Sequence, residues 1–474
     1  MAGDSANLPE GVASLLDTDL YKLTMQCCIL KFFPDVSVTY GFTNRTPDKK
    51  LNRAAFNWLQ AQVEKLENIR VTQDELSFLE KKCPYLNAQY LHFLSTFRLQ
   101  PSKQLKLLFN PIDDTGSDHD LGDFRIHTEG LWLDTILYEI PLLALVSEAY
   151  FKFVEKDWSH EGQVEKAYQK GRTLLEGGCI VSEFGSRRRR DYHTQDLVLQ
   201  GLRRAADEGQ KAGWPGKLTG SSNVHFAMRH DMLPIGTVAH EWFMGVAAIT
   251  NNYKSANEIA LQYWTATFGE GVLSIALTDT FGTPAFLEAF KKQIPQVTTA
   301  VLDGGTTTQP PSEAPIHEPT GPRKTYAQAF VGVRQDSGDP LDFIKMMREF
   351  YDQQGIQDKK TIVFSDSLNI DLCFKYKAAA EAEGFQPTFG VGTFLTNDFV
   401  EKSTGRKSVP LNIVIKISSA SGRHAVKISD NIGKNTGDKA TVEDVKQRLG
   451  YTEKQWAGGD EKTRWGSASQ AATQ

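Results

Sequence analysis

CIVSEF (179–184) is the first of seven short apolar runs that recur between about residues 178 and 400. The other six are KLTG (217–220), PIGTVA (234–239), VLSIALT (272–278), FVGVR (330–334), TIVFS (361–365) and PTFGV (387–391). Helix starts follow several runs: Asp339 is a natural N-cap before Pro340, and Ser255 opens another helix. Repeated strand–helix units predict a parallel sheet with helical crossovers, either a barrel or an open doubly wound sheet.

The flanking segments have a different pattern. Residues 15–150 read mostly as helices, for example 54–69, with a strand at QLKLLFN (104–110) and a loop at 110–123. Near the end, IVIKIS and RHAVKIS predict a hairpin, and TVEDVKQRLG (441–450) predicts a helix with a capping arrangement of Thr441 and Asp444.

The composition narrows the class of protein. The 474 residues carry 53 Lys and Arg against 58 Asp and Glu, a net charge of −5, which argues against a nucleic-acid scaffold. The five cysteines form no CxxC pair and predict free thiols. No apolar run is long enough to span a bilayer, and the N-terminus lacks the design of a signal peptide. We expect a cytosolic enzyme, with the nucleus also open.

Polar residues follow each of the seven runs. The segments are GSRRRR, SSN, HEW, DTFGT, QDSGD, DSLN and GTFLTND, in chain order. Because the carboxyl ends of parallel strands meet at one face of a sheet, we expect these segments to build a single composite site.

Two of these segments are candidate anion sites. The four arginines at 187–190 precede a helix whose N-terminal amides could help bind a polyphosphate, although such a run can also be a solvated helix start or a localisation signal. One or two of these arginines should lie on the surface. Gly390 and Gly392 would let backbone N–H groups approach a phosphate, although GxG is often only a turn.

Carboxylates and one histidine complete the candidates. Asp336 and Asp366 stand at neighbouring strand ends, and a carboxylate there can bind ribose hydroxyls and stabilise positive charge at the sugar. His240 follows PIGTVA, but a lone histidine is more often structural than catalytic. Glu241 beside it would normally face solvent.

Taken together, ten segments resemble the nicotinate phosphoribosyltransferase family. They are LLDTDLYKLTM (15–25), WLDTILYEIPLLALVSE (132–148), EFGSRRR (183–189), GSSNVHFA (220–227), PIGTVAHEWFMG (234–245), DTFGTPAFL (279–287), GVRQDSGDP (332–340), FSDSLN (364–369), FGVGTFLTND (389–398) and VKISDNIGKNTG (426–437). The resemblance implies an irregular seven-stranded α/β barrel at 151–400, with a smaller α/β domain built from residues 11–150 and 401–455. We expect a flexible insertion at 294–325, rich in Thr, Pro and Gly, and a frayed tail at 456–474.

The resemblance also implies roles for individual residues. His240 falls on the family's phosphorylated histidine. The nicotinate pocket falls on Tyr21, Phe184, Asp279 and Arg334, and the ribose and phosphate contacts on Arg187, Ser222, Asp336, Ser365, Gly390, Gly392 and Thr393. Many members have Thr in place of Ser186, which keeps the hydroxyl. No metal ligands can be assigned.

By this resemblance, ATP phosphorylates His240, and the phosphoenzyme binds phosphoribosyl pyrophosphate and Mg²⁺ more favourably. Nicotinate then displaces pyrophosphate to give nicotinate mononucleotide, the first step of salvage from nicotinate to NAD. Because ATP is consumed as a C–N bond forms, the enzyme would formally be a ligase. The chain should act without nucleic acid or membrane, and a homodimer is possible.

Three alternatives remain. A nicotinamide-using enzyme of the same fold differs in its base. Arg334 suits a nicotinate carboxylate, but related enzymes can place an arginine nearby too, so the family resemblance, rather than Arg334 alone, favours nicotinate. A barrel glycosidase could use Asp336 and Asp366 as paired carboxylates. An arginine-run nucleic-acid-binding protein conflicts with the net charge and the lack of nearby aromatic residues.

Overall fold

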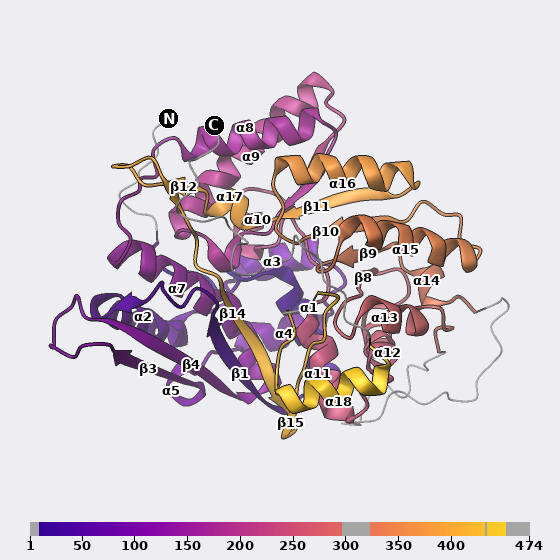
Figure 1. Ribbon diagram of the computed structural model, residues 1–474, viewed down its shortest axis with the longest axis horizontal. Coiled ribbons are helices and arrows are strands. Elements are labelled where there is room, and N and C mark those ends of the chain that lie inside the picture. The colour runs from indigo at the N-terminus through magenta and orange to yellow at the C-terminus, as the bar shows by residue number, and fades with distance from the viewer. Residues whose placement is uncertain (1–8, 296–322, 432–433, 452–474) are drawn as a thin grey trace.

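The computed structural model describes residues 9–295, 323–431 and 434–451 (Figure 1). A curled seven-stranded parallel sheet, with every neighbouring pair parallel, forms its larger half. Its strand order is β7 (Leu233–Pro234), β6 (Lys217–Ser221), β5 (Ile180–Glu183), β11 (Gln386–Val391), β10 (Thr361–Phe364), β9 (Gly332–Gln335) and β8 (Ile275–Leu277). Within this sheet the first strand along the chain, β5, lies beside the last, β11, so Val181 pairs with Phe389 in the middle of the sheet.

The seven apolar runs correspond to these seven strands, so the predicted α/β barrel class is confirmed. The strand predicted at PIGTVA is too long. Only Pro234 of this run is in β7, and residues 235–239 form a loop that leads into helix α11. Gly236 within this loop lies against α1, where an added Cβ would be 3.0 Å from Cβ of Leu20.

The helices connect and cover the sheets. They are α1 (Leu20–Phe32), α2 (Arg53–Lys65), α3 (Gln73–Lys82), α4 (Ala88–Thr96), α5 (Pro101–Gln104), α6 (Trp132–Thr135), α7 (Glu139–Phe153), α8 (Gln163–Glu176), α9 (Tyr192–Ala212), α10 (Val224–Arg229), α11 (His240–Thr250), α12 (Ala256–Phe268), α13 (Thr283–Phe290), α14 (Tyr326–Ala329), α15 (Pro340–Gln353), α16 (Ile370–Ala382), α17 (Thr393–Thr396) and α18 (Lys439–Leu449). The predicted cap Asp339 accepts a hydrogen bond from the backbone of Leu341 at the start of α15. Ser255 precedes α12 but makes no side-chain cap.

A six-stranded antiparallel sheet forms the smaller half, seen at the lower left of Figure 1. Its order is β15 (Arg423–His424), β14 (Ile413–Ala420), β1 (Ser37–Asn44), β4 (Leu121–Leu131) and β2 (Leu51–Asn52), with β3 (Leu105–Pro111) also paired to β4. The prediction that 15–150 is mostly helical is therefore wrong for β1 and β4. Buried and exposed side chains alternate along much of β4, and the loop predicted at 110–123 overlaps only its first three residues.

The C-terminal hairpin prediction is right for β14 and only partly right for the strand after it. The second strand ends at His424, and residues 425–431 continue toward the ends of the parallel strands. The last helix, α18, begins at Lys439 because Asp438, rather than Thr441, is its cap and accepts from the backbone of Thr441 at 2.9 Å. Gly450 ends it in the left-handed conformation, as predicted.

Two sequence features lie mostly outside the described residues. The insertion predicted at 294–325 is described only at 294–295 and 323–325, and the tail at 456–474 is not described. Among the described helices, none combines the length and apolar character that crossing a membrane requires.

Candidate active site

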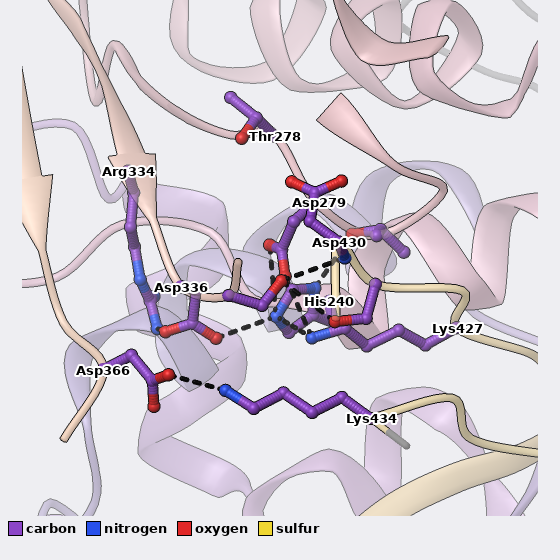
Figure 2. A network of polar contacts seen from close by, with 12 residues as sticks. His240, Thr278, Asp279, Arg334, Asp336, Asp366, Lys427, Asp430 and Lys434 are labelled. Carbon is purple, nitrogen blue, oxygen red and sulfur yellow. Dashed lines mark hydrogen bonds and ion pairs between the residues drawn. The ribbon is translucent and has the colours of Figure 1, made fainter. Parts of the chain in front are cut away.

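His240 is the first residue of α11, and its imidazole lies in a network of charged side chains (Figure 2). Its Nδ1 is 2.9 Å from the hydroxyl of Thr280, beyond the end of β8. Its Nε2 accepts from the ammonium of Lys427 at 2.9 Å and lies 3.0 Å from Asp336 and 3.6 Å from Asp279. The structure thus brings a predicted nucleophile and two predicted carboxylates together.

Two effects control the charge of His240. Burial, and then the positive charge of Lys427, lower the pKa of the imidazole to about 4, although Asp279 and Asp336 oppose this. Near neutral pH the ring is therefore uncharged and has a nitrogen lone pair. A neutral imidazole is the form that can attack a phosphorus atom.

Asp336 links His240 to Arg334 on β9. One of its oxygens faces Nε2 of His240, and the other accepts from Arg334 at 2.9 Å and from Ser365 at 2.7 Å. Burial alone would raise the pKa of Asp336, but Arg334 and His240 hold it well below its usual range. Asp336 is therefore an anion that is fixed at both oxygens.

Asp279 is almost fully buried behind His240. Its Oδ2 lies 3.2 Å from Lys427 and accepts from Ser337, and Lys427 lowers its pKa against the effect of burial. Its Oδ1 is buried without a hydrogen-bond partner. Because ligand atoms of Asp279, Asp336 and His240 lie within 4.8 Å of one another, the two carboxylates suit a divalent cation that prefers oxygen ligands.

A pocket adjoins this network at the ends of β5, β9, β10 and β11. Its lining residues are Phe184, Gly185, Arg187, Arg188, Arg334, Ser365, Ser367, Leu368, Gly390, Gly392, Thr393 and Phe394. Arg334 both lines the pocket and binds Asp336, so it joins the two parts of the site. Three of its N–H groups donate to Ser365, Thr237 and Asp336, which fix its plane.

Gly390 and Gly392 allow Phe184 to lie close to β11. A Cβ on Gly390 would meet the ring of Phe184 at 2.4 Å, and one on Gly392 would meet its carbonyl oxygen at 2.9 Å. The close approach measured at these glycines is thus to Phe184, while the predicted backbone contact with a phosphate stays a prediction.

The arginine run divides between the pocket and the fold. Arg187 and Arg188 both line the pocket, and Arg187 exposes 44% of its side chain to solvent. Arg189 and Arg190 are fully buried: the first pairs with Asp17 at 2.7 Å, and the second stacks on Phe151 and Phe399. Asp191 caps α9 and accepts from the backbone of Thr194, so its carboxylate already binds one amide of the helix, while anion binding by the remaining amides stays a prediction.

Tyr21 and Ser222 do not line this pocket. Ser222 is buried and donates to Asp19 at 2.8 Å, and Ser186 donates to the same oxygen at 2.7 Å. The hydroxyl of Ser186, which a threonine at this position would also have, therefore makes a hydrogen bond in this structure. Tyr21 is also buried near charged side chains. Burial, and then the negative charge of Glu139, raise the pKa of Tyr21, while the positive charge of Arg187 lowers it.

Sequence reasoning did not identify Lys427 and Lys434 as members of the site, and its expectation for Glu241 is wrong. Lys427 contacts His240 across 187 positions of the chain, and its segment had been assigned to a hairpin strand. Lys434 pairs with Asp366 at 2.6 Å (Figure 2). Glu241, expected to face solvent, is buried and accepts from Tyr40 and Trp132. All three residues lie in segments that resemble the family, but the resemblance assigned them no role, because their partners are distant in sequence.

Known proteins resemble this chain over nearly its whole length. A model of the nicotinate phosphoribosyltransferase N-terminal domain matches residues 16–147, and one of the nicotinate phosphoribosyltransferase family matches 179–303 and 316–453. The nicotinate phosphoribosyltransferase of Saccharomyces cerevisiae is 44% identical over 459 residues, covering 96% of this chain and 99% of the relative.

Solved structures agree. A crystal structure from Saccharomyces cerevisiae, 44% identical, superposes with a TM-score of 0.83 over 94% of this chain and 100% of that chain. That of nicotinate phosphoribosyltransferase from Porphyromonas gingivalis, 30% identical, gives 0.76 over 93% and 100%. With both halves of the chain matched in sequence and in fold, this protein belongs to the nicotinate phosphoribosyltransferase family.

Proposed function

We propose that this chain joins nicotinate to phosphoribosyl pyrophosphate, releasing nicotinate mononucleotide and pyrophosphate, and that ATP drives the reaction through a phosphorylated His240. Family membership supports the transfer reaction. Because ATP is hydrolysed as a C–N bond forms, the enzyme is formally a ligase. Its product enters the salvage route to NAD.

One observation carries the coupling to ATP: His240, Asp336 and Arg334 form a continuous row from the buried imidazole to the pocket. The uncharged His240 can accept a phosphoryl group at one end. Arg334 can bind the carboxylate of nicotinate at the other end. Only the carboxylate of Asp336 therefore separates His240, the site of phosphorylation, from Arg334, which binds the base.

The pocket residues divide between the substrates. We assign the nicotinate ring to Phe184, and the phosphates of the other substrate to Arg187, Gly392 and Thr393. Ser365 holds Arg334 and Asp336 in place, Ser222 supports this edge through Asp19, and Asp279 positions Lys427.

Each step balances in bonds and charge. A ring nitrogen of His240 forms a bond to the γ-phosphorus of ATP as ADP leaves. In the transfer step, the bond from C1 of the ribose to pyrophosphate breaks, and the nicotinate nitrogen bonds to C1. Asp336 can hydrogen-bond the ribose hydroxyls and stabilise the positive charge that develops at C1. Water then attacks the phosphorus atom of the phosphohistidine, which breaks the N–P bond, releases inorganic phosphate and restores His240.

Mg²⁺, held by Asp279 or Asp336 together with phosphate oxygens, would neutralise charge on the leaving group. The buried, unpartnered oxygen of Asp279 fits such a cation.

The alternatives have less support. The positive charge of Arg334 favours nicotinate over uncharged nicotinamide. In a glycosidase, Asp366 would need to act freely as an acid or base, but it is paired with Lys434 at 2.6 Å. A nucleic-acid surface would need the arginine run exposed, and two of its four members are buried.

Product analysis tests the proposal. The purified chain is incubated with phosphoribosyl pyrophosphate, Mg²⁺ and either nicotinate or nicotinamide, with and without ATP. We expect nicotinate mononucleotide as the main product, formed faster with ATP. Faster formation of nicotinamide mononucleotide would reverse the choice of base.

We also propose that the enzyme acts in the cytoplasm, with the nucleus open, and forms a homodimer. Fluorescent tagging and light scattering of the purified chain test these two statements.

A further inference from the structure

A row of four alternating charges runs from the pocket to the start of α11, and three of its members, Glu139, Lys22 and Glu241, have no role in the chemistry proposed above. It consists of Arg187, Glu139, Lys22 and Glu241. The ammonium of Lys22, on α1, is fully buried, 2.5 Å from Oε2 of Glu139 and hydrogen-bonded to Oε2 of Glu241. The other oxygen of Glu139 lies 3.7 Å from the guanidinium of Arg187. Lys22 is thus the only member with both of its charged neighbours inside the row and no exposure to solvent.

The two ends of the row reach different parts of the site. Arg187 lines the pocket and exposes 44% of its side chain, so an anionic ligand can reach it. Glu241 follows His240 directly at the start of α11. The Oε1 of Glu241 accepts from the hydroxyl of Tyr40 at 2.6 Å and from the indole of Trp132 at 2.8 Å, so its carboxylate is held on both oxygens.

Folding alone does not require this row. Replacing a buried ion pair by apolar side chains of similar volume is often neutral or stabilising, because burying the charges is costly. The aromatic core next to the row, where Trp132 stacks on Trp242 and Phe33 packs on both, shows that apolar side chains fit here. Stability alone therefore does not account for the charges.

Ligand binding changes the balance along the row. An anion at Arg187 competes with Glu139 for the same guanidinium, and Glu139 is then left with Lys22 as its cation. The attraction of Lys22 is shared between Glu139 and Glu241, so a stronger bond to the first weakens the bond to the second. In a buried site such changes are poorly screened by solvent.

We propose that Lys22 is a positioning residue that couples anion binding at Arg187 to the setting of Glu241 and His240 at the start of α11. The inference rests on the proposed function, in which Arg187 binds the phosphates of the sugar substrate and His240 accepts the phosphoryl group. Lys22 touches neither substrate and acts through Glu139 and Glu241.

The indole N–H of Trp132 reports on Glu241 in the unaltered protein. The chain is labelled with ¹⁵N-tryptophan, the Trp132 signal is assigned with Trp132→Phe, and Mg²⁺ with pyrophosphate is added as the probe of Arg187. We expect the Trp132 signal to shift as pyrophosphate binds. A bound state with an unchanged Trp132 signal, or no binding of pyrophosphate, would contradict the proposal.

A charge-balanced variant shows whether the shift passes through the row. Lys22→Met with Glu139→Gln removes one positive and one negative charge and leaves Glu241 with its Tyr40 and Trp132 donors. The matched control, Arg53→Met with Asp120→Asn, removes an ion pair of 3.0 Å at the start of α2. We expect the pyrophosphate-induced shift to be lost in the first variant and kept in the second; a shift retained in both would contradict the role of Lys22.

A kinetic measurement gives the same test for the coupling. The rate of labelling of His240 from γ-labelled ATP is compared with and without phosphoribosyl pyrophosphate. Coupling energies between sites typically correspond to about 5–150-fold, so we expect a ratio of about fivefold or more in the unaltered protein and near one in Lys22→Met with Glu139→Gln. An equal ratio in both would contradict the inference. If the unaltered protein takes no label and makes no nicotinate mononucleotide, the proposed function fails instead, while the Trp132 measurement still decides the coupling.

Discussion

At the scale of single residues, the protonation state of the His240 imidazole depends on its burial and on the positive charge of Lys427. The pKa of about 4 lies below the usual value for histidine of about 6.5. The folded chain therefore binds this proton less tightly than the unfolded chain. The contribution to stability is full above the unfolded value and is lost as the pH falls from there toward the folded pKa.

We predict that the His240 ring signals in an NMR titration show a pKa near 4. Lys427→Met should raise this pKa, because the variant lacks the cation that faces Nε2. The signals are assigned by comparison with His240→Gln. A pKa at the usual histidine value in the unaltered chain, or no change in Lys427→Met, would show that the network does not control the charge of His240.

Arg334 should determine the affinity for nicotinate. Hydrogen bonds to charged groups contribute about 1.5–3 kcal/mol, so Arg334→Ala should raise the KM for nicotinate roughly ten- to hundredfold. Ser365→Ala is the control, since it removes a partner of Arg334 and keeps the guanidinium. A nicotinate KM that is the same in Arg334→Ala as in the unaltered enzyme would place the carboxylate elsewhere.

At the scale of elements, the packing of β11 against Phe184 sets the shape of the pocket. Gly390→Ala would place a methyl group 2.4 Å from the Phe184 ring and displace it. Overpacking costs about 1–3 kcal/mol, so we expect the KM for nicotinate to rise about tenfold. In the control, Gly41→Ala, the nearest atom is the Ser418 hydroxyl oxygen at 3.1 Å, which can move. Equal kinetics for the two variants would contradict the assignment of the ring to Phe184.

The sequence predicts elements well where local rules act alone. The short apolar runs identify all seven parallel strands, and Asp339 with Pro340 marks the start of α15. Prediction fails where tertiary contacts decide. β1 forms a strand because β4 and β14 pair with it on both sides, and residues 425–431 leave the hairpin to reach the site.

At the scale of the whole molecule, distant segments of the chain meet at one site. β14, near the C-terminus, pairs with β1, and the chain after it carries Lys427 to His240 (Figures 1 and 2). Their places after strand-like runs make His240 and Asp336 candidates for the site, but the role of His240 comes from the family resemblance rather than from its position. The sequence could not predict Lys427, or that Arg189 and Arg190 serve the core, because the partners of these residues are set by the fold.

If ATP drives base transfer through His240, γ-labelled ATP should transfer its label to this residue. The unaltered chain and His240→Ala are each incubated with labelled ATP, and acid-labile, base-stable phosphoprotein is measured beside nicotinate mononucleotide synthesis. The account predicts label and ATP-stimulated synthesis only in the unaltered chain. His240→Ala should keep a slow synthesis that ATP does not affect, since the transfer step needs only the ring nitrogen, C1 and a stabilised leaving group. Label and ATP-stimulated synthesis in His240→Ala would contradict the account.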